Sequence, residues 1–203
     1  MSTRLVLIRH GRTAWNHEGR FQGRADIPLD EHGRAQAGRM AVHVSNLMPA
    51  AIVSSDLLRA RQTADALASV TGLPVRLDAR LQEIDVGSWS GRTIEDAAAE
   101  MPDLHDALRE GRDFRRSPSG ETAVEAGTRV AEVLLELAAE SPDRTVAVVG
   151  HGLALRMAVL RLVGWDLPTG LGLSGLWNGS WTVLERRERW RILSYNNVAP
   201  EPA

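Results

Sequence analysis

Short apolar runs typical of buried strands alternate along this chain with longer runs that have helical spacing. The strand-like runs are residues 4–9, 50–55, 74–78 and 145–150. The helix-like runs are residues 31–47, 56–72, 122–140 and 151–164. Strands that alternate with helices form βαβ units, which predict a mostly parallel sheet covered by helices on both faces. We therefore expect an α/β fold, a three-layer αβα sandwich with a mostly parallel central sheet.

The remaining segments extend this fold without dividing it. Residues 93–110 look helical but poorly amphipathic, whereas residues 81–91 and 113–121 are rich in turn residues typical of loops. Residues 180–196 are interpreted as a β-hairpin. Because no repeat, low-complexity segment or linker separates these parts, we expect a single domain over residues 1–203.

Specific residues mark two of the expected helix ends. Thr122 and Glu125 have the spacing of a capping box, which predicts that a helix begins there. Gly72 follows the helix-like run 56–72 as its C-terminal cap, because glycine adopts the left-handed conformation that ends many helices.

Composition limits the classes of function. A chain of 203 residues with 43% hydrophobic side chains can bury one core. The net charge of −2 gives no overall attraction to nucleic acid or anionic membranes, so we expect neither as a partner. The absence of cysteine excludes disulfides and fits the reducing cytoplasm, the location we expect. All 24 basic residues are arginine, which excludes P-loop, Schiff-base and pyridoxal lysines.

Charged residues follow three of the predicted strands at the point where each strand ends. The first strand runs into Arg9, His10 and Gly11, and the strand at 145–150 runs into His151 and Gly152. After the strand at 50–55, Arg59 lies one turn into the next helix. Because the carboxyl ends of parallel strands meet at one edge of a sheet, we expect these side chains to gather there.

The expected cluster is suited to an anion. Gly11 and Gly152 let the backbone approach a ligand closely, and helix N-termini add N–H groups that favour negative charge. Arginine binds phosphate bidentately, so phosphate is the simplest ligand. Either histidine alone is more often a satisfied polar residue, and Arg59 could lie on a solvated helix face as we expect for Arg61. Two strand–His–Gly units in one chain favour the site.

The segment "RHGRTAWN" resembles the histidine phosphatase (phosphoglycerate mutase-like) superfamily. Further segments that resemble the family follow in its order and cover essentially the whole chain: "FQGRADIPLDEHGRAQA", "SSDLLRARQTA", "LQEIDVGSWSG", "SGET" and "VVGHG". Within the phosphatase branch, "SSDLLRA", "TGLPVRLDARL" and "NGSW" are most similar to glucosyl-3-phosphoglycerate phosphatases. The resemblance implies a phosphoglycerate mutase-like sandwich and a hydrolase.

The resemblance also implies a role for individual residues. His10 matches the histidine that becomes phosphorylated, and Glu83 matches the general acid. The residues that match the phosphate site are Arg9, Asn16, Gln22, Gly23, Arg59, His151 and Gly152. Position 12 is arginine where the family commonly has Glu or Gln, and we expect this change to affect only the rim of the pocket.

The expected chemistry needs neither a cofactor nor a metal. Arg9 and Arg59 would offset the phosphate charge and lower the pKa of His10, which keeps the imidazole neutral and nucleophilic. A carboxylic acid, Glu83 or the competing Asp85, would protonate the leaving alkoxide and then activate water. Histidines surrounded by arginines would repel a metal cation, so no metal site is expected.

Three functions remain open at this point. The leading one is a phosphatase acting on small phosphorylated metabolites, and the others are a 2,3-bisphosphoglycerate-dependent phosphoglycerate mutase and a non-catalytic phosphate-binding module. The short chain favours hydrolysis over mutase activity, as does the absence of lysine after the acid segment, residues 81–91, which contains Glu83. Arg115 and Arg116 resemble paired arginines that hold a substrate carboxylate, with a plain surface loop as the near-equal alternative. The oligomeric state stays open, and a homodimer is compatible with the sequence.

Overall fold

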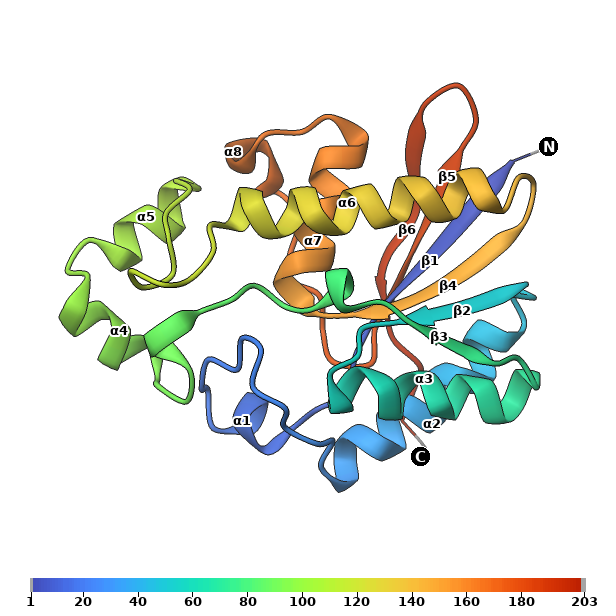
Figure 1. Ribbon diagram of the computed structural model, residues 1–203, viewed down its shortest axis with the longest axis horizontal. Helices are drawn as coiled ribbons and strands as arrows, with labels where there is room; N and C mark the ends of the chain where they lie inside the picture. The colour runs from blue at the N-terminus through green and yellow to red at the C-terminus, as the bar shows by residue number, and fades with distance from the viewer. Residues whose placement is uncertain (1, 202–203) are drawn as a thin grey trace.

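A six-stranded mixed sheet forms the centre of the computed structural model, which describes residues 2–201 (Figure 1). Its strands are β1 (Thr3–Arg9), β2 (Ala51–Ser54), β3 (Val75–Leu77), β4 (Thr145–Gly150), β5 (Trp181–Arg186) and β6 (Trp190–Asn197). The order across the sheet is β3-β2-β4-β1-β5-β6. The first four run parallel, β5 is antiparallel to β1, and β6 is antiparallel to β5. The expected mostly parallel sheet is confirmed.

Four long helices cover both faces of this sheet. The helices of the described residues are α1 (Ala14–His17), α2 (Glu31–Ser45), α3 (Leu58–Thr71), α4 (Ile94–Glu100), α5 (Leu104–Glu110), α6 (Ala123–Glu140), α7 (Gly152–Val163) and α8 (Leu167–Gly170). Helices α2 and α3 lie against one face, and α6 and α7 lie against the other (Figure 1). This arrangement is the three-layer αβα sandwich expected from the sequence.

The central strand β1 shows why its sequence is apolar without interruption. Leu5 and Leu7 pack in the core beneath α6 and α7, whereas Val6 and Ile8 pack in the core formed with α2 and α3. Successive side chains of a strand point to opposite faces, so a strand covered on both sides needs an apolar residue at every position.

The two marked helix ends have the expected geometry. Helix α6 begins with Thr122 accepting a hydrogen bond from the Glu125 N–H at 3.1 Å, while the Glu125 carboxylate accepts the Thr122 N–H at 2.8 Å. Helix α3 ends at Gly72, whose φ of +72° lies in the left-handed region. Both predictions are confirmed.

Residues 93–110 differ from the single helical run expected there. They form the two short helices α4 and α5, separated at Met101–Asp103 around Pro102. Proline disfavours helical geometry in the residue before it, which explains the break. Two single 3₁₀ turns, η1 (Ala79–Leu81) and η2 (Gly87–Trp89), lie in the adjoining loop.

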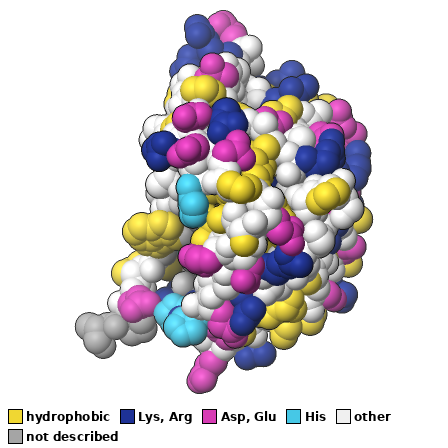
Figure 2. All heavy atoms as spheres, turned by 90° about the vertical axis from the view of Figure 1, so that its left-hand side faces the viewer, with side chains coloured by type: hydrophobic (Ala, Val, Ile, Leu, Met, Phe, Trp, Pro, Cys, Tyr) yellow, Lys and Arg dark blue, Asp and Glu magenta, His cyan; other side chains and the backbone are white. Residues whose placement is uncertain are grey.

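Helices α1, α4 and α5 lie on the side of the molecule to which the parallel strands point (Figure 1, left). Seen from that side, arginine and acidic side chains are interspersed with hydrophobic ones (Figure 2). Within residues 2–201, none of the helices is both long and apolar enough to cross a membrane.

Candidate active site

Two histidines meet at the carboxyl edge of the sheet. Strands β1 and β4 are neighbours, and their register pairs Arg9 with Gly150. His10 and His151 therefore leave the sheet side by side, with ring centroids 5.2 Å apart and ring planes inclined by 59°. Their exposed fractions are 3% and 0%. The structure thus brings together the two strand–His–Gly units found in the sequence.

The backbone fixes the tautomer of His10. Its Nδ1 lies 2.7 Å from the Gly11 carbonyl oxygen, and because a carbonyl only accepts, Nδ1 carries the proton. The lone pair is then on Nε2. Burial, followed by the positive charges of Arg59 and Arg9, holds the pKa of His10 well below its usual value. His10 is consequently a neutral imidazole with a nucleophilic Nε2 near neutral pH.

His151 is oriented by a serine at the end of the neighbouring strand β2. Its Nε2 lies 2.9 Å from the Ser55 hydroxyl oxygen, while its Nδ1 is buried and has no partner among the described residues. When the Ser55 hydroxyl donates to Nε2, Nδ1 carries a proton that is available to an oxyanion. Burial and the charge of Arg59 hold the pKa of His151 well below its usual value.

The two arginines beside these rings, Arg59 (buried) and Arg9 (half-buried), are cations bonded to backbone carbonyls. Arg59, which is 0% exposed, donates to the carbonyls of Gly23 at 2.8 Å and Ala25 at 2.6 Å. Arg9 donates to the carbonyl of Leu176. Burial lowers the pKa of Arg59 to about 10, so it remains charged near neutral pH. The Nε atoms of both arginines are buried without a partner among the described residues.

Two glycines allow the backbone to come close to this cluster. Gly23 has φ +53°, and a Cβ there would lie 2.6 Å from Cγ2 of Val86, so no other residue fits without a shift. A Cβ on Gly152 would lie 3.1 Å from Nε of Arg9, which places the first turn of α7 against that guanidinium. Gln22, next to Gly23, is also buried, and its Oε1 has no partner within residues 2–201.

Asn16 lies at the start of the site, on α1. Its Oδ1 accepts hydrogen bonds from the Thr13 N–H at 3.2 Å, the Thr13 hydroxyl at 3.1 Å and Nδ2 of Asn178 at 3.2 Å. The three bonds fix the amide with its oxygen turned to the protein, which leaves its NH₂ group as the donor. The expectation that Asn16 supplies a neutral donor is compatible with this orientation.

The carboxylate of Glu83 lies at the N-terminus of α7. It accepts hydrogen bonds from the N–H groups of Ala154 at 2.9 Å and Leu153 at 3.2 Å. Its charge also acts on Arg9 and Arg59, so it belongs to the same cluster. Asp85, the competing carboxylate, instead accepts the Gly87 N–H at 2.8 Å and faces Arg24 at 3.6 Å.

The structure separates the two members of the arginine pair. Arg115 is exposed and forms an ion pair with Glu125 at 2.6 Å. Arg116 is 7% exposed and lies over the Phe114 ring at 3.8 Å from its centroid. Burial lowers the pKa of Arg116 to about 10, and the charges of Asp113 and then Glu83 partly offset this effect. Of the two arginines, only Arg116 is buried and acted on by the charge of Glu83.

Asn178 and Gly179 are site residues to which sequence reasoning gave no role. Asn178 Nδ2 donates to the carbonyls of His10 at 3.2 Å and Gly11 at 3.4 Å, and the Gly179 N–H donates to the His10 carbonyl at 3.0 Å. They fix the turn that carries the candidate nucleophile. The available signal was an Asn–Gly pair, typical of turns, immediately before a strand.

Arg12, the position that departs from the family, forms its contacts with α2 and the residue that caps it. Its Nε donates to the Asp30 carboxylate at 2.8 Å, and its backbone N–H donates to Gln36 Oε1 at 2.9 Å. Asp30 also caps α2 by accepting the Gly33 N–H at 2.7 Å. The Arg12 guanidinium is thus directed to the start of α2.

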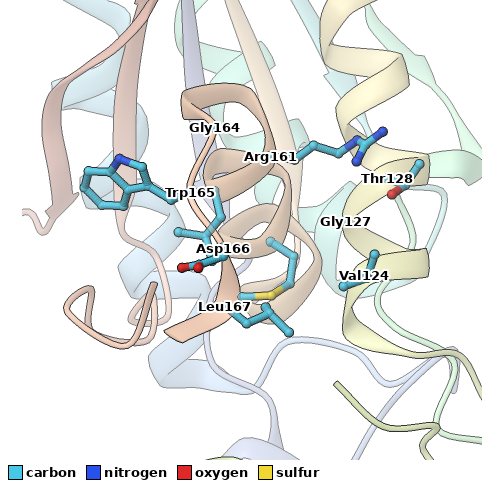
Figure 3. Close-up of a pocket in the computed structure, with 10 residues that line it drawn as sticks. Val124, Gly127, Thr128, Arg161, Gly164, Trp165, Asp166 and Leu167 are labelled. Atoms are coloured by element: carbon cyan, nitrogen blue, oxygen red, sulfur yellow. The ribbon is translucent and has the colours of Figure 1, made fainter. Parts of the chain in front are cut away.

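A separate cavity of about 350 Å³ lies between α6 and α7 (Figure 3). Thr128 of α6 and Arg161 of α7 line it together with Trp165, which follows α7. None of the candidate phosphate or acid residues lines this cavity, so it is distinct from the site at the sheet edge.

The arrangement at the sheet edge combines buried positive charge, unpartnered N–H groups, a neutral imidazole and a carboxylate. These are the requirements for binding a phosphoryl group, attacking it and protonating its leaving group. A binding module would need only the first two of these features.

Comparison with known proteins agrees with this chemistry. The sequence profile of the histidine phosphatase superfamily (branch 1) matches residues 5–198. The glucosyl-3-phosphoglycerate phosphatase of Mycobacterium tuberculosis is 38% identical over 217 residues, spanning 97% of this chain and 95% of that protein. The probable phosphoglycerate mutase GpmB of Escherichia fergusonii is 34% identical over 194 residues, spanning 96% of this chain and 83% of that protein.

A solved structure of a mycobacterial glucosyl-3-phosphoglycerate phosphatase with VO₃ superposes with a TM-score of 0.87 at 37% identity, covering 95% of this chain and 98% of that one. The chain belongs to branch 1 of the histidine phosphatase superfamily. It is a phosphoric monoester hydrolase that acts on small phosphomonoesters.

Proposed function

We propose that this enzyme hydrolyses acidic phosphorylated metabolites, of which glucosyl-3-phosphoglycerate is the foremost candidate, through a phosphohistidine on His10. The observation that carries the proposal is the set of groups around His10. Its free Nε2 lies among buried donors that have no partner within residues 2–201: Arg9 Nε, Arg59 Nε and His151 Nδ1. A phosphoryl group would satisfy all three.

In the first step, Nε2 of His10 attacks phosphorus as the bond from phosphorus to the substrate oxygen breaks. Protonated Glu83 gives its proton to the departing alkoxide. Arg9, Arg59 and His151 hold the charge that spreads over the phosphoryl oxygens, which is where preorganised donors accelerate a reaction most. The products of this step are the free alcohol and phosphorylated His10.

In the second step, the Glu83 carboxylate takes a proton from water as the water oxygen attacks phosphorus. The bond between phosphorus and His10 Nε2 breaks, and inorganic phosphate leaves. Glu83 ends the cycle protonated and His10 ends it neutral, so the reaction needs no external proton carrier. The backbone N–H groups of Leu153 and Ala154 stabilise the carboxylate during this step.

Arg116 is the proposed contact for the substrate carboxylate. It is buried, and the charges of Asp113 and Glu83 act on it, but it forms no ion pair with either or with any other acidic residue among the described residues. Its guanidinium is held by the Phe114 ring and by a hydrogen bond to the Phe114 carbonyl at 2.8 Å. These contacts orient a cation without neutralising it, which suits a substrate derived from a phosphoglycerate.

A screen of phosphorylated metabolites tests the substrate. The panel contains glucosyl-3-phosphoglycerate, 3-phosphoglycerate, 2-phosphoglycerate and phosphoserine, with glucose 6-phosphate as the substrate that lacks a carboxylate. The highest kcat/KM for glucosyl-3-phosphoglycerate supports the proposal. A preference for glucose 6-phosphate over every carboxylate-bearing substrate contradicts it.

Mutase activity is the second candidate, favoured by Arg116 and by the likeness to GpmB. In a mutase the phosphoryl group returns from His10 to the bound glycerate instead of passing to water. Supplying 3-phosphoglycerate with catalytic 2,3-bisphosphoglycerate separates the two activities. Release of inorganic phosphate indicates the phosphatase, and efficient conversion to 2-phosphoglycerate with little phosphate release indicates the mutase.

Other expectations stay predictions. We propose that residues 1–203 form one catalytic domain that acts in the cytoplasm and has neither nucleic acid nor membrane as a partner. Size-exclusion chromatography with light scattering measures whether the chain is a homodimer.

A further inference from the structure

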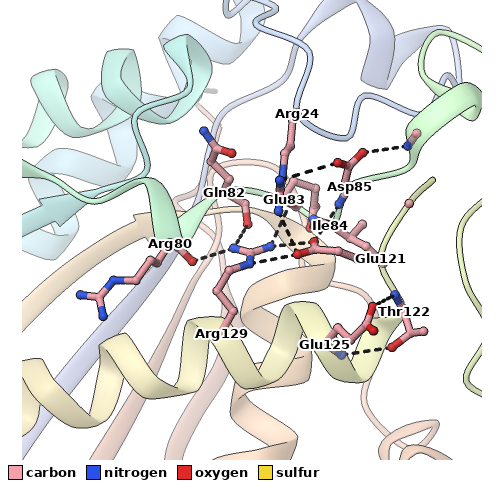
Figure 4. Close-up of polar contacts among 12 residues, drawn as sticks. Arg24, Arg80, Gln82, Glu83, Ile84, Asp85, Glu121, Thr122, Glu125 and Arg129 are labelled. Atoms are coloured by element: carbon pink, nitrogen blue, oxygen red, sulfur yellow. Dashed lines mark hydrogen bonds and ion pairs between the residues drawn. The ribbon is translucent and has the colours of Figure 1, made fainter.

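Arg129 of α6 uses every N–H group of its guanidinium in one cluster beside the acid segment (Figure 4). Three of its hydrogen bonds go to backbone carbonyls: Arg80 at 2.6 Å, Gln82 at 3.0 Å and Glu83 at 3.4 Å. The other two go to the Glu121 carboxylate, at 3.2 Å and 2.9 Å. Arginine has five such donors, so none is left for a substrate.

Glu121, in the loop that precedes α6, is the second residue of this cluster. We call Arg129 and Glu121 together the clamp, because both bind the backbone of residues 80–85. Its Oε2 accepts the Asp85 N–H at 2.9 Å, and its own backbone N–H donates to the Asp85 carbonyl at 2.8 Å. Arg24 donates to Oε1 at 2.8 Å. Burial raises the pKa of Glu121, but the hydrogen bonds from Arg129 and Asp85, with the charge of Arg24, outweigh it and lower the pKa overall. Glu121 is therefore a carboxylate at neutral pH.

The clamp holds residues 80–85, and Glu83 is in the middle of this segment. Apart from the turn η1 at its start, the segment is neither helix nor strand, so its backbone groups depend on partners from elsewhere in the chain. Arg129 and Glu121 supply partners on both sides of Glu83. The Glu83 side chain accepts hydrogen bonds from the N-terminus of α7 and from the Ile84 N–H at 2.9 Å. Contacts to the backbone and contacts to the side chain thus together determine where the carboxylate lies.

We propose that Arg129 and Glu121 are positioning residues that keep Glu83 within proton-transfer distance of the leaving oxygen. The inference rests on the proposed role of Glu83 as general acid. All hydrogen bonds of the Arg129 guanidinium go to the segment around Glu83 and to Glu121, and none goes to His10 or Arg59. Its positive charge also acts on His151, so the test variant at position 129 keeps a cation. Misplacement of a catalytic group by about 1 Å costs on the order of 10²-fold in rate. In kcat/KM, which reports phosphorylation of His10, the loss falls on substrates whose leaving group needs a proton.

The experiment compares a glycerate phosphate with p-nitrophenyl phosphate, whose leaving group departs without protonation. Arg129→Lys keeps the charge but cannot hold three carbonyls and a carboxylate at once. Glu121→Gln keeps the shape but removes the charge that fixes the guanidinium. We expect each variant to lower kcat/KM on the glycerate phosphate by roughly 10- to 100-fold. The kcat/KM on p-nitrophenyl phosphate excludes the later hydrolysis of phosphorylated His10, in which Glu83 acts as base on every substrate. It should therefore change by less than about threefold, as should the inhibition constant of vanadate.

Matched controls come from the same segment and the same helix. Arg80 and Glu136 form an exposed ion pair at 2.8 Å, between the acid segment and α6, that does not involve Glu83. Arg80→Lys and Glu136→Gln make the same chemical changes as the test variants. Both should keep wild-type kcat/KM on both substrates, because exposed pairs contribute little to structure.

The possible outcomes separate this inference from the role of Glu83. Glu83→Gln should show the same selective loss of kcat/KM on the glycerate phosphate. If it does, and Arg129→Lys and Glu121→Gln lower kcat/KM equally on both substrates, the positioning role is wrong. If Glu83→Gln itself loses equally on both, the assigned acid is wrong and the inference falls with it. Melting temperatures identify unfolded variants, and loss of the fold in both test variants would assign the pair to stability and overturn the inference.

Discussion

The two halves of the candidate site are built in different ways. The phosphate half stands on the ends of β1, β2 and β4, with Arg59 and His151 fully buried and bonded to backbone or to a neighbouring strand residue. The acid half is a loop whose shape depends on side chains from α6 and from the 113–121 loop. The sheet fixes the residues proposed to bind the phosphoryl group, whereas long-range side-chain contacts fix Glu83, the residue proposed to transfer the proton. The halves should therefore respond differently to substitution.

The largest effect is expected at His10, the centre of the phosphate half. His10→Ala removes Nε2, the proposed nucleophile, so turnover of aryl and alkyl phosphates should both fall to background while the fold persists. Quenching the wild-type enzyme during turnover should trap an acid-labile phosphohistidine, which mass spectrometry can locate. Phosphate found on His151 instead would reverse the assigned roles of the two histidines.

Substitution of Arg59 or His151 should cause the next largest loss of rate. Each supplies a buried donor to the proposed transition state, and loss of one such donor typically costs ~10²–10³ in rate. Arg59→Ala and His151→Ala should show this loss on both substrate types, together with weaker inhibition by vanadate. Arg61→Ala, on the exposed side of the same helix as Arg59, should be unchanged. Near-full activity of either test variant would remove that residue from the pocket.

The contrast between the halves also explains what could be predicted from the sequence. The edge containing His10, Arg59 and His151 follows from strand ends and helix starts, which are local patterns. The contacts from Arg129 to residues 80–83 connect positions 46 to 49 residues apart, and no local pattern indicates them. The sequence likewise treated Arg115 and Arg116 as a pair, although the side chains diverge: one pairs with Glu125, and the other is buried over Phe114.

Arg116 should give a smaller and more selective effect, because it is proposed to contact only the substrate carboxylate. Arg116→Gln should raise KM for carboxylate-bearing phosphates by about tenfold, the equivalent of one hydrogen bond to a charged group at roughly 1.5 kcal/mol. The kcat on p-nitrophenyl phosphate should stay unchanged. Arg115→Gln should alter neither parameter if its exposed pair with Glu125 is only a surface contact. An equal KM change in both variants would mean that the pair acts together.

The smallest effect is expected in the pH dependence of the free energy of unfolding. Protonation of groups in the two halves should destabilise the fold in different pH ranges. Burial holds the pKa values of His10 and His151 below the value of about 6.5 in an unfolded chain. Below that pH the unfolded state binds protons that the folded state refuses, so stability is present above pH 6.5 and falls on acidification. Each unit below it costs roughly 1.4 kcal/mol per neutral histidine.

Glu121, in the acid half, has a lowered pKa, so its contribution persists above the unfolded value of about 4.3 and is lost only below it. Urea unfolding between pH 7.5 and 3.5 should therefore show a first decline that depends on the buried histidines and a later one that depends on Glu121. His10→Gln should flatten the first decline, while His105→Gln, exposed on α5, should not. Glu121→Gln should flatten only the second. If His10→Gln leaves the slope between pH 6.5 and 5.5 unaltered, His10 binds protons as readily in the folded state as in the unfolded chain, which contradicts the lowered pKa proposed for the nucleophile of the phosphate half.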